Sequence, residues 1–249
     1  RVTMAERILY QFPISHYCEK SRWQLDHKGL AYRTVNLLPV THRVRTQWLA
    51  RTNTVPLLRD GKRRVSDSTK IAYYLEKYYP DQPLLPKAGD ARARVIELEQ
   101  QFDRYGVHVR RWVYGQILDR SEVMTALVGD CGLPGPLERL AKPLVREAIR
   151  RGYAINPQRV MRSEQRVEEA LVLLESELKK GQGQYLVGDR FSLADITAAS
   201  MLAPLISPQG SPWDLFDETT LSPTLRKQME NWRARPAGKW LLAMYAQDR

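Results

Sequence analysis

Residues 55–68 read VPLLRDGKRRVSDS. Two runs that favour β-structure, residues 55–58 and 63–65, flank Asp60-Gly61, a dipeptide typical of a two-residue hairpin turn. Val55-Pro56 stands at the start of the first run, and an X-Pro bond at such a point can be cis. The polar run at residues 66–68 is typical of a helix start, because Ser and Asp side chains cap the first backbone N–H groups. The stretch therefore predicts a β-hairpin that leads directly into a helix.

The segments on either side of this hairpin alternate between strand-like and helix-like patterns. Apolar spacings of three and four continue the helix over residues 68–79. Pro13 ends a short β-rich run, and Gly29 ends a helical one. The resulting order for residues 1–80 is β-α-β-α-β-β-α, and its remaining predicted elements are strand 7–12, helix 18–28, strand 31–38 and helix 44–50.

Three prolines within residues 80–86 mark a domain boundary, because proline blocks helix continuation and stiffens a linker. We predict an α/β domain over residues 1–80, a linker over 81–89 and an all-helical domain over 90–249. The helical domain has predicted long helices over 91–117 and 161–180, and a capping box at Ser192-Leu193-Ala194-Asp195. Residues 121–160 show no readable pattern.

Charge is concentrated in the α/β domain. The 249-residue chain has a net charge of +11, and residues 1–80 hold 15 Lys or Arg against 6 Asp or Glu, a net of +9. Such a field attracts anions without identifying them. The arginines are scattered and no recognition motif accompanies them, so we expect no nucleic acid partner.

The chain carries no predicted membrane span or secretory signal. No window holds 18 uninterrupted apolar residues, and the basic start lacks an apolar run behind it. Met4 is the expected natural start. Cys18 and Cys131 are too few for a disulfide framework. We therefore expect a reduced, soluble, cytoplasmic protein.

Ser15-His16-Tyr17-Cys18 lies between the first strand and the first helix. The Ser15 hydroxyl either caps the helix or helps its N-terminus to stabilise a thiolate. Cys18 is either a nucleophile with a lowered pKa or a small buried residue. His16 is expected at the surface, and no metal-ligand cluster is present, so we expect no metal.

Asp67 and Ser68 likewise have one structural and one ligand-binding interpretation. Either they start the helix after the hairpin, or Asp67 accepts a ligand ammonium while Ser68 and its amide hold a carboxylate.

Four motifs in this order resemble those of the glutathione transferases. They are the turn at residues 15–22 (SHYCEKSR), Val55-Pro56 before a strand, Asp67-Ser68 before a helix, and the box at residues 191–195 (FSLAD). The likeness is close over residues 7–85 and moderate over 186–245. It implies a thioredoxin-like N-terminal domain followed by a helical bundle.

The resemblance also implies roles for individual residues. Ser15 matches the catalytic serine or cysteine, Val55 the residue that pairs with the cysteinyl unit of glutathione ahead of a cis proline at Pro56, and Asp67 and Ser68 the pair that holds the γ-glutamyl end. The family's segment before Val55 is shortened here, so ligands for the glycyl carboxylate are uncertain. Its candidates are His42, Arg43 and Arg45, and Tyr17 and Cys18 are second-rank site residues.

The family resemblance implies an enzyme, a glutathione transferase that conjugates the co-substrate glutathione to electrophilic small molecules in detoxification, and a homodimer. Two alternatives stay open: a non-catalytic binding or scaffold protein, and a glutathione-dependent disulfide reductase. The acceptor substrate would lie against the first helices of the helical domain. Aromatic residues at helical spacing on one predicted helix are the candidates for this pocket, although such residues are usually core: Tyr105, His108, Trp112 and Tyr114.

Overall fold

The computed structural model describes residues 6–39, 41–181 and 184–249. Met4, the expected start, lies outside them. The N-terminal part contains a sheet and three helices in the predicted order, β-α-β-α-β-β-α, which confirms the thioredoxin-like prediction. Its elements are β1 (Arg7–Gln11), α1 (His16–His27), β2 (Arg33–Asn36), α2 (His42–Ala50), β3 (Leu57–Asp60), β4 (Arg63–Ser66) and α3 (Ser68–Tyr78).

The sheet is mixed, with the strand order β2-β1-β3-β4. Strand β1 runs parallel to β2 and antiparallel to β3, which pairs antiparallel with β4. Gly61 has a positive φ of 56°, so it supplies the conformation that the tight β3–β4 turn requires. The predicted hairpin is therefore present, with its two-residue loop at Gly61-Lys62, one residue beyond the predicted Asp60-Gly61.

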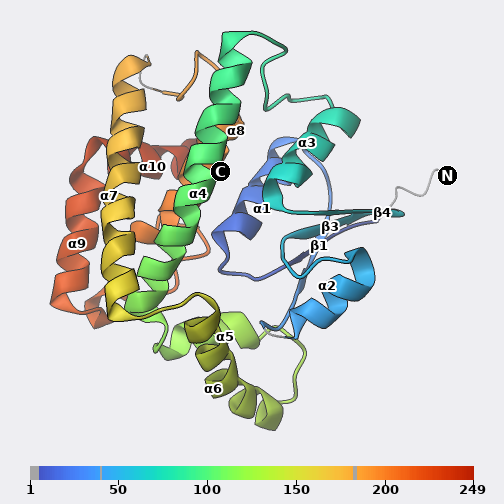
Figure 1. Cartoon of the computed structure of the whole chain (residues 1–249), viewed down its shortest axis with the longest axis vertical. Helices are drawn as coiled ribbons and strands as arrows, with labels where there is room; N and C mark the ends of the chain where they lie inside the picture. The colour runs from blue at the N-terminus through green and yellow to red at the C-terminus, as the bar shows by residue number, and fades with distance from the viewer. Residues whose placement is uncertain (1–5, 40, 182–183) are drawn as a thin grey trace. The chain divides into compact units, whose positions relative to one another are not determined.

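One face of the sheet carries the core of this part. Helices α1 and α3 cover that face and α2 lies on the other (Figure 1). Apolar residues from β1, β3, α1 and α3 form the buried cluster, namely Leu9, Leu25, Leu58, Ile71, Tyr74 and Leu75. Burial of each leucine or isoleucine stabilises the fold by roughly 1.5–3 kcal/mol.

Lys28 ties the end of α1 to the end of α3. Its buried ammonium forms an ion pair with Glu76 at 2.7 Å and donates to the backbone carbonyl of Tyr79 at 2.9 Å. It also donates to the carbonyls of Asp81 and Gln82. A positive charge is favourable at the C-terminal end of a helix, and the bonds of Lys28 to three carbonyls hold residues 79–82 next to the end of α3.

The chain beyond residue 84 is helical apart from its connections. Its elements are α4 (Asp90–Ile117), α5 (Ser121–Val128), α6 (Gly135–Gly152), α7 (Pro157–Lys180), α8 (Leu193–Leu202), α9 (Pro223–Ala234) and α10 (Pro236–Gln247), with short 3-10 helices at Ala203–Leu205 and Glu218–Thr220. The predicted helices over 91–117 and 161–180 correspond to α4 and α7. Residues 121–160, which had no predicted structure, contain α5, α6 and the start of α7.

Helix α4 packs against both α7 and α8 (Figure 1). All ten residues of α8 are buried, as expected of a helix that is apolar on every side. The predicted capping box at its start is confirmed: the Asp195 carboxylate accepts from the Ser192 N–H and from its hydroxyl, both at 2.8 Å. Its other oxygen accepts from the Leu186 N–H, also at 2.8 Å.

The chain divides into two compact units. One contains residues up to Pro83 together with Met124–Ala148, and the other contains Leu84–Val123 and Ile149–Arg249. The extra helical residues 124–148 thus group with the thioredoxin-like part. The predicted division into residues 1–80, 81–89 and 90–249 stays a prediction.

The buried carboxyl of Asp195 leads to a testable prediction about stability. Burial raises its pKa from 3.8 to about 6. The folded chain then holds the proton more tightly than the unfolded chain. The resulting stabilisation is complete below pH 3.8 and is lost as the pH rises through about 6. Two pKa units correspond to roughly 3 kcal/mol.

The variant Asp195→Asn does not titrate and should lack this dependence. We expect the wild type to lose roughly 3 kcal/mol of unfolding free energy relative to the variant between pH 4 and pH 7. Urea unfolding of both proteins at several pH values measures the difference. If the difference in unfolding free energy between the two proteins is constant from pH 4 to pH 7, Asp195 does not have a raised pKa.

Candidate functional site

Three loops leave the sheet at one end. In the antiparallel β1–β3 pair, Tyr10 near the end of β1 lies opposite Leu57 at the start of β3. Leu57 in turn lies opposite Ser66, the last residue of β4. The loop after β1, the loop before β3 and the connection from β4 to α3 therefore lie side by side. They carry Ser15, Val55-Pro56 and Asp67-Ser68 respectively.

Ser15 is the N-cap of α1. Its half-buried side chain accepts a hydrogen bond from the Cys18 N–H at 3.3 Å. The oxygen is thereby held at the positive end of the helix dipole, and the Ser15 side chain also forms a hydrogen bond with the Cys18 thiol that lowers the pKa of that thiol against the effect of burial. Capping and anion stabilisation are therefore compatible at this residue.

Arg22 supports the loop that leads to Ser15. Its guanidinium donates to the Pro13 carbonyl at 3.2 Å and to the Gln11 side chain, and it pairs with Glu19 at 2.8 Å. Arg22 is 9% exposed and Glu19 is 1% exposed. Arg22 belongs to the motif that carries the family resemblance, yet its spacing on α1 gave no signal that its charge would be buried beneath the loop.

Cys18 is fully buried, and burial raises the pKa of its thiol. Both facts favour the interpretation of Cys18 as a small buried residue over that of a nucleophile. The expectation of a surface position for His16 is wrong: it is 3% exposed and its ring packs on half-buried Tyr17 at 4.5 Å. It lies in the first turn of a helix that buries both polar and apolar side chains.

The Val55–Pro56 peptide bond is cis. The Pro56 carbonyl accepts a hydrogen bond from the Asp67 N–H at 3.2 Å, which joins the loop before β3 to the start of α3. Pro56 is buried and Val55 is half-buried, so Val55 borders the surface where the three loops meet.

Asp67 combines a strained backbone with a carboxylate whose two oxygens have different surroundings. Its φ is 80°, a backbone angle that residues other than glycine rarely adopt and that is often found at functional sites. Oδ1 accepts from the N–H groups of Thr69 and Lys70, at 2.9 and 3.1 Å. No residue in the described part of the chain donates to Oδ2. The structural and ligand-binding interpretations of Asp67 therefore apply to different oxygens of one carboxylate.

The start of α3 is held from below by two buried side chains of α1. Lys20, which is fully buried, donates to the Thr69 hydroxyl at 3.0 Å. Gln24 donates to the Ser68 carbonyl at 3.3 Å. Ser68 itself is 3% exposed. Nothing in the sequence indicates that Lys20 and Gln24 are buried, because charged and amide side chains on a helix are normally solvated.

The three candidates for a carboxylate ligand on α2 differ in charge. The Nε2 of His42 lies 3.1 Å from the Asn53 carbonyl, and burial lowers the pKa of the ring, which disfavours its charged form. Arg43 and Arg45 are exposed and permanently charged, and Arg45 lies 5.5 Å from the ring of Tyr10. Their permanent positive charge therefore favours the two arginines over His42 as partners of a carboxylate.

The four candidates for an acceptor pocket do not share one face of α4. Tyr105 and His108 border a polar pocket with Arg166, whereas Trp112 lines an apolar pocket elsewhere. Tyr114 stacks on Tyr153 at 5.8 Å. At 100° per residue Tyr114 lies half a turn from Tyr105, whereas Trp112 lies about 20° from Tyr105 and is separated from it by about two turns along the helix axis.

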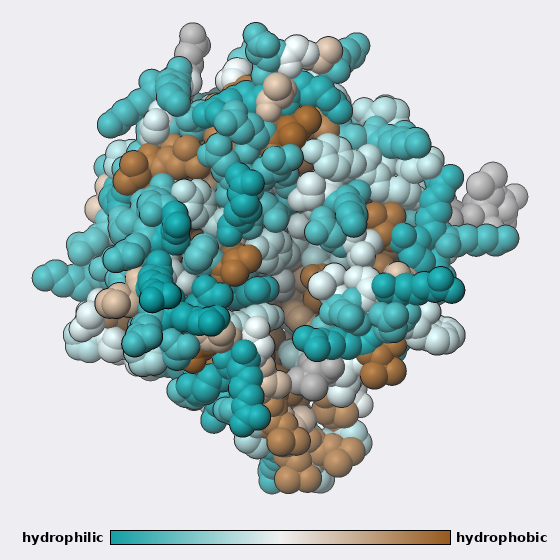
Figure 2. Space-filling view, in the orientation of Figure 1, coloured by the Kyte–Doolittle hydropathy of each residue, from teal (hydrophilic) through white to brown (hydrophobic). Residues whose placement is uncertain are grey.

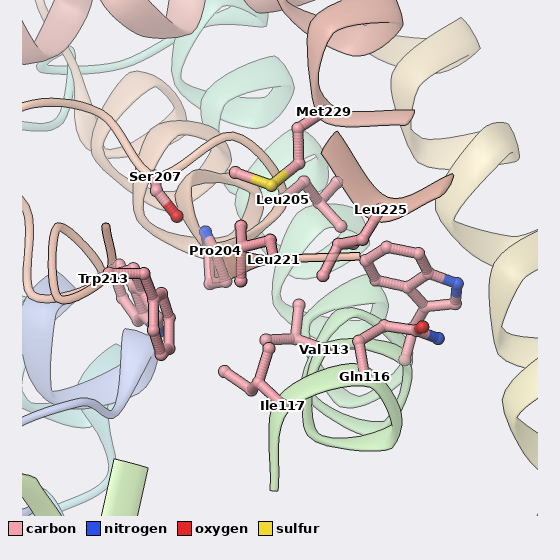
Figure 3. A pocket seen from close by; sticks show the side chains of 12 residues that line it. Val113, Gln116, Ile117, Pro204, Leu205, Ser207, Trp213, Leu221, Leu225 and Met229 are labelled. Carbon is pink, nitrogen blue, oxygen red and sulfur yellow. The ribbon is translucent and has the colours of Figure 1, made fainter. Parts of the chain in front are cut away.

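The apolar pocket lies within the helical unit, between the end of α4, the segment after α8, and α9. Figure 3 shows Leu225 and Met229 facing Val113 and Ile117 across it. Its enclosed space is about 20 Å³, room for one water-sized group in this side-chain arrangement. Only Gln116 and Ser207 contribute polar side chains besides the Trp indoles. The lining consists of Trp112, Val113, Gln116, Ile117, Pro204, Leu205, Ser207, Trp213, Phe216, Leu221, Leu225 and Met229.

Within residues 6–39, 41–181 and 184–249, no group of three or more His, Cys, Asp or Glu side chains is placed to hold a metal ion. Nor does any helix of these residues have the length and apolar character needed to cross a membrane.

Comparison with known proteins matches both parts of the chain. The family models for the N-terminal and C-terminal domains of glutathione S-transferase match residues 9–83 and 138–235. Glutathione S-transferase F10 of Arabidopsis thaliana is 26% identical over 229 residues, which cover 89% of this chain and 90% of that protein.

Two solved structures illustrate the shared fold. A glutathione S-transferase from Sinorhizobium meliloti 1021 has a TM-score of 0.62 at 20% identity, covering 98% of this chain and 99% of that one. A glutathione S-transferase from Methylobacterium radiotolerans JCM 2831, in complex with glutathione sulfonate, has a TM-score of 0.57 at 24% identity, covering 94% and 93%.

Because only the Oδ1 oxygen of Asp67 caps α3, we predict different stabilities for two variants of this residue. Asp67→Ala removes the cap and should lower the unfolding free energy by about 0.5–2 kcal/mol. Asp67→Asn keeps an oxygen in the place of Oδ1 and should stay within about 0.5 kcal/mol of the wild type, because Asn and Asp cap equally well. Urea unfolding of the three proteins tests this. Equal losses in both variants would show that the Oδ1 cap contributes nothing.

Proposed function

The chain belongs to the glutathione S-transferase family, and on that premise we propose that it is a transferase that conjugates glutathione to electrophilic small molecules. The observation that carries the proposal is the placement of Ser15. Its hydroxyl caps α1 at the end of the sheet where the Pro56 and Asp67 loops also emerge.

In the proposed mechanism Ser15 stabilises the thiolate of bound glutathione. The Cys18 N–H donates to the Ser15 oxygen, and the Ser15 hydrogen donates to the glutathione sulfur. A free thiol has a pKa near 8.5, so only a few per cent is thiolate at neutral pH. Lowering this pKa by about two units raises the reactive fraction more than tenfold. The thiol proton passes to solvent before the attack.

The sulfur lone pair then forms a bond to the electrophilic carbon of the acceptor, while the bond to the leaving group breaks and takes its electron pair with it. Glutathione is therefore a co-substrate, and no covalent bond to the enzyme forms. An aryl halide, which releases halide, is the simplest acceptor of this kind.

Glutathione itself fits the charges of the thioredoxin-like part. It carries two carboxylates and one ammonium. We propose that Asp67 Oδ2 accepts from the ammonium, that Ser68 and its amide hold the adjacent carboxylate, and that Val55 pairs with the cysteinyl backbone. Arg43 and Arg45 are the proposed partners of the glycyl carboxylate.

The acceptor is proposed to be apolar. The pocket that Trp112 lines supports this, because its walls are almost wholly apolar. Its small enclosed space would have to widen, and the flexible thioether of Met229 is suited to such a movement. Tyr105, His108 and Tyr114 have no comparable support as acceptor ligands. The proposal includes a homodimer in the cytoplasm, and a monomeric mass in solution would contradict the dimer.

Two other functions are tested directly. A scaffold protein would produce no heat when millimolar glutathione is titrated into it, whereas a transferase should bind. A glutathione-dependent disulfide reductase that used Cys18 would lose activity in Cys18→Ala. The full burial and raised pKa of Cys18 argue against that second alternative.

We predict that Ser15→Ala lowers turnover with a generic aryl halide about tenfold to hundredfold while glutathione affinity stays nearly unchanged, because the hydroxyl interacts with the reacting sulfur. Ser15→Thr, which retains a hydroxyl and a capping oxygen, is the matched control and should retain most of the activity. Steady-state kinetics and calorimetry measure the two effects. Full turnover in the alanine variant would remove Ser15 from the mechanism.

For Asp67 we predict a loss of binding without a loss of stability. Asp67→Asn replaces Oδ2 by a donor, so the dissociation constant of glutathione should rise about tenfold to hundredfold. N-acetylated glutathione lacks the ammonium and should bind wild type and variant similarly. Calorimetry of both ligands with both proteins forms a double-substitution cycle. Losses additive within about 0.5 kcal/mol would mean that carboxylate and amine do not meet.

A further inference from the structure

The groove between α4 and α7 carries arginines that the proposed transferase function does not use. Arg104 and Arg111 lie on α4, and Arg159 and Arg166 lie on α7. Arg166 pairs with Glu169 at 2.7 Å. In the part of the chain that the structure describes, no carboxylate lies within ion-pair distance of Arg104, Arg111 or Arg159. The two helices pack together within one compact unit, and hydrophilic side chains cover most of this face (Figure 2).

A buried serine fixes the inner wall of the groove. Ser163 on α7 is fully buried, and its oxygen accepts from Arg111 Nη1 at 3.1 Å and lies 3.2 Å from His108 Nδ1. The hydroxyl has one hydrogen left, which it can donate to Nδ1. This arrangement leaves the Nε2–H of His108 as a donor. Arg111 is anchored further by its hydrogen bond to the Tyr153 carbonyl at 2.9 Å.

The positive charges of the groove act on one another. Burial, together with the charges of Arg159 and Arg110, lowers the pKa of Arg111. Burial and the charges of Arg111 and Arg166 likewise lower the pKa of His108, while the carboxylate of Glu169, which pairs with Arg166, acts in the opposite direction. Burial is the largest cause for both groups, and the neighbouring cations add to it. An anion in the groove would relieve the repulsion between these cations.

An open pocket of about 380 Å³ lies where these cations converge. Its walls are Gln101, Arg104, Tyr105, His108 and Arg166. Two guanidinium groups, a ring N–H and an amide therefore surround one space. Planar guanidinium groups with several N–H donors match the oxygens of phosphate and sulfate groups.

We propose that this groove binds a tetrahedral oxyanion, a phosphate or sulfate group, through Arg104, Arg166 and His108. The site lies wholly within the helical unit and involves none of the residues proposed to bind glutathione. The anion is either a free inorganic ion or the charged group of an organic molecule whose remainder contacts the ring of Tyr105.

The test is calorimetric titration of the full chain without glutathione, in chloride buffer at constant ionic strength. Inorganic phosphate, sulfate and phenyl phosphate are the probes. We expect saturable one-to-one binding to the wild type. Equal affinity for phosphate and phenyl phosphate would identify a free oxyanion, and tighter binding of phenyl phosphate would identify an organic one.

Three substitutions that each remove one positive charge complete the test. Arg104→Gln and Arg166→Gln should each weaken phosphate binding about tenfold, the factor that one charge-assisted hydrogen bond provides. Arg104 is exposed, so its replacement should leave thermal unfolding unchanged. Arg190→Gln alters an exposed arginine of the same unit that does not line the pocket, and it should bind phosphate like the wild type.

The proposal is overturned if millimolar phosphate and sulfate produce no saturable heat, or if Arg190→Gln weakens binding as much as Arg104→Gln. It is also overturned if Arg104→Gln dissociates a dimer in sedimentation while the wild type binds no phosphate. The arginines would then pair with acidic residues of a second copy of the chain.

Discussion

The hydrogen bond from the Asp67 N–H to the Pro56 carbonyl, at 3.2 Å, joins the two loops on which the candidate glutathione site depends. Pro56 precedes β3 and Asp67 follows β4, so this bond links the two strands of the hairpin at the end opposite its turn. The bond also holds Asp67 at its positive φ. That conformation lets one carboxylate oxygen cap α3 while the other is left without a donor. The backbone conformation of Asp67 thus leaves its Oδ2 oxygen available as a hydrogen-bond acceptor.

Buried charge, rather than apolar packing alone, positions the remaining site residues. Arg22 holds the loop before Ser15, Lys20 reaches the first turn of α3, and Lys28 binds the carbonyl of Tyr79 at the end of α3. Arg22 and Lys20 lie on α1, a helix that buries more polar than apolar side chains, and Lys28 is its C-cap. Because a buried cation must be satisfied by specific acceptors, the contacts of Lys20 and Lys28 restrict how α1 packs against α3.

Short-range signals explain how much of the fold and site could be predicted. Asp60-Gly61 and the capping box at Ser192 act within a few residues, and both lead to the expected structures. Within residues 121–160 the signals conflict: Asn156 and Pro157 start α7 as local rules expect, whereas α6 continues through Pro143, a residue type that normally ends or kinks a helix. The site followed the same rule. The loop positions of Ser15 and Asp67 were predictable, whereas the lowered pKa of His42 is caused by burial, which depends on how α2 packs in the fold.

The state of the two thiols has a consequence for the proposed conjugation of electrophiles. Cys18 is fully buried with a raised pKa, and burial and neighbouring Asp130 and Glu138 raise the pKa of half-buried Cys131 to about 11. Neither side chain is a thiolate at neutral pH, and only thiolates react quickly with such compounds. The chain therefore resists alkylation by its own proposed substrates. Bound glutathione would be the one activated sulfur in the complex, and inactivation during turnover would be slow.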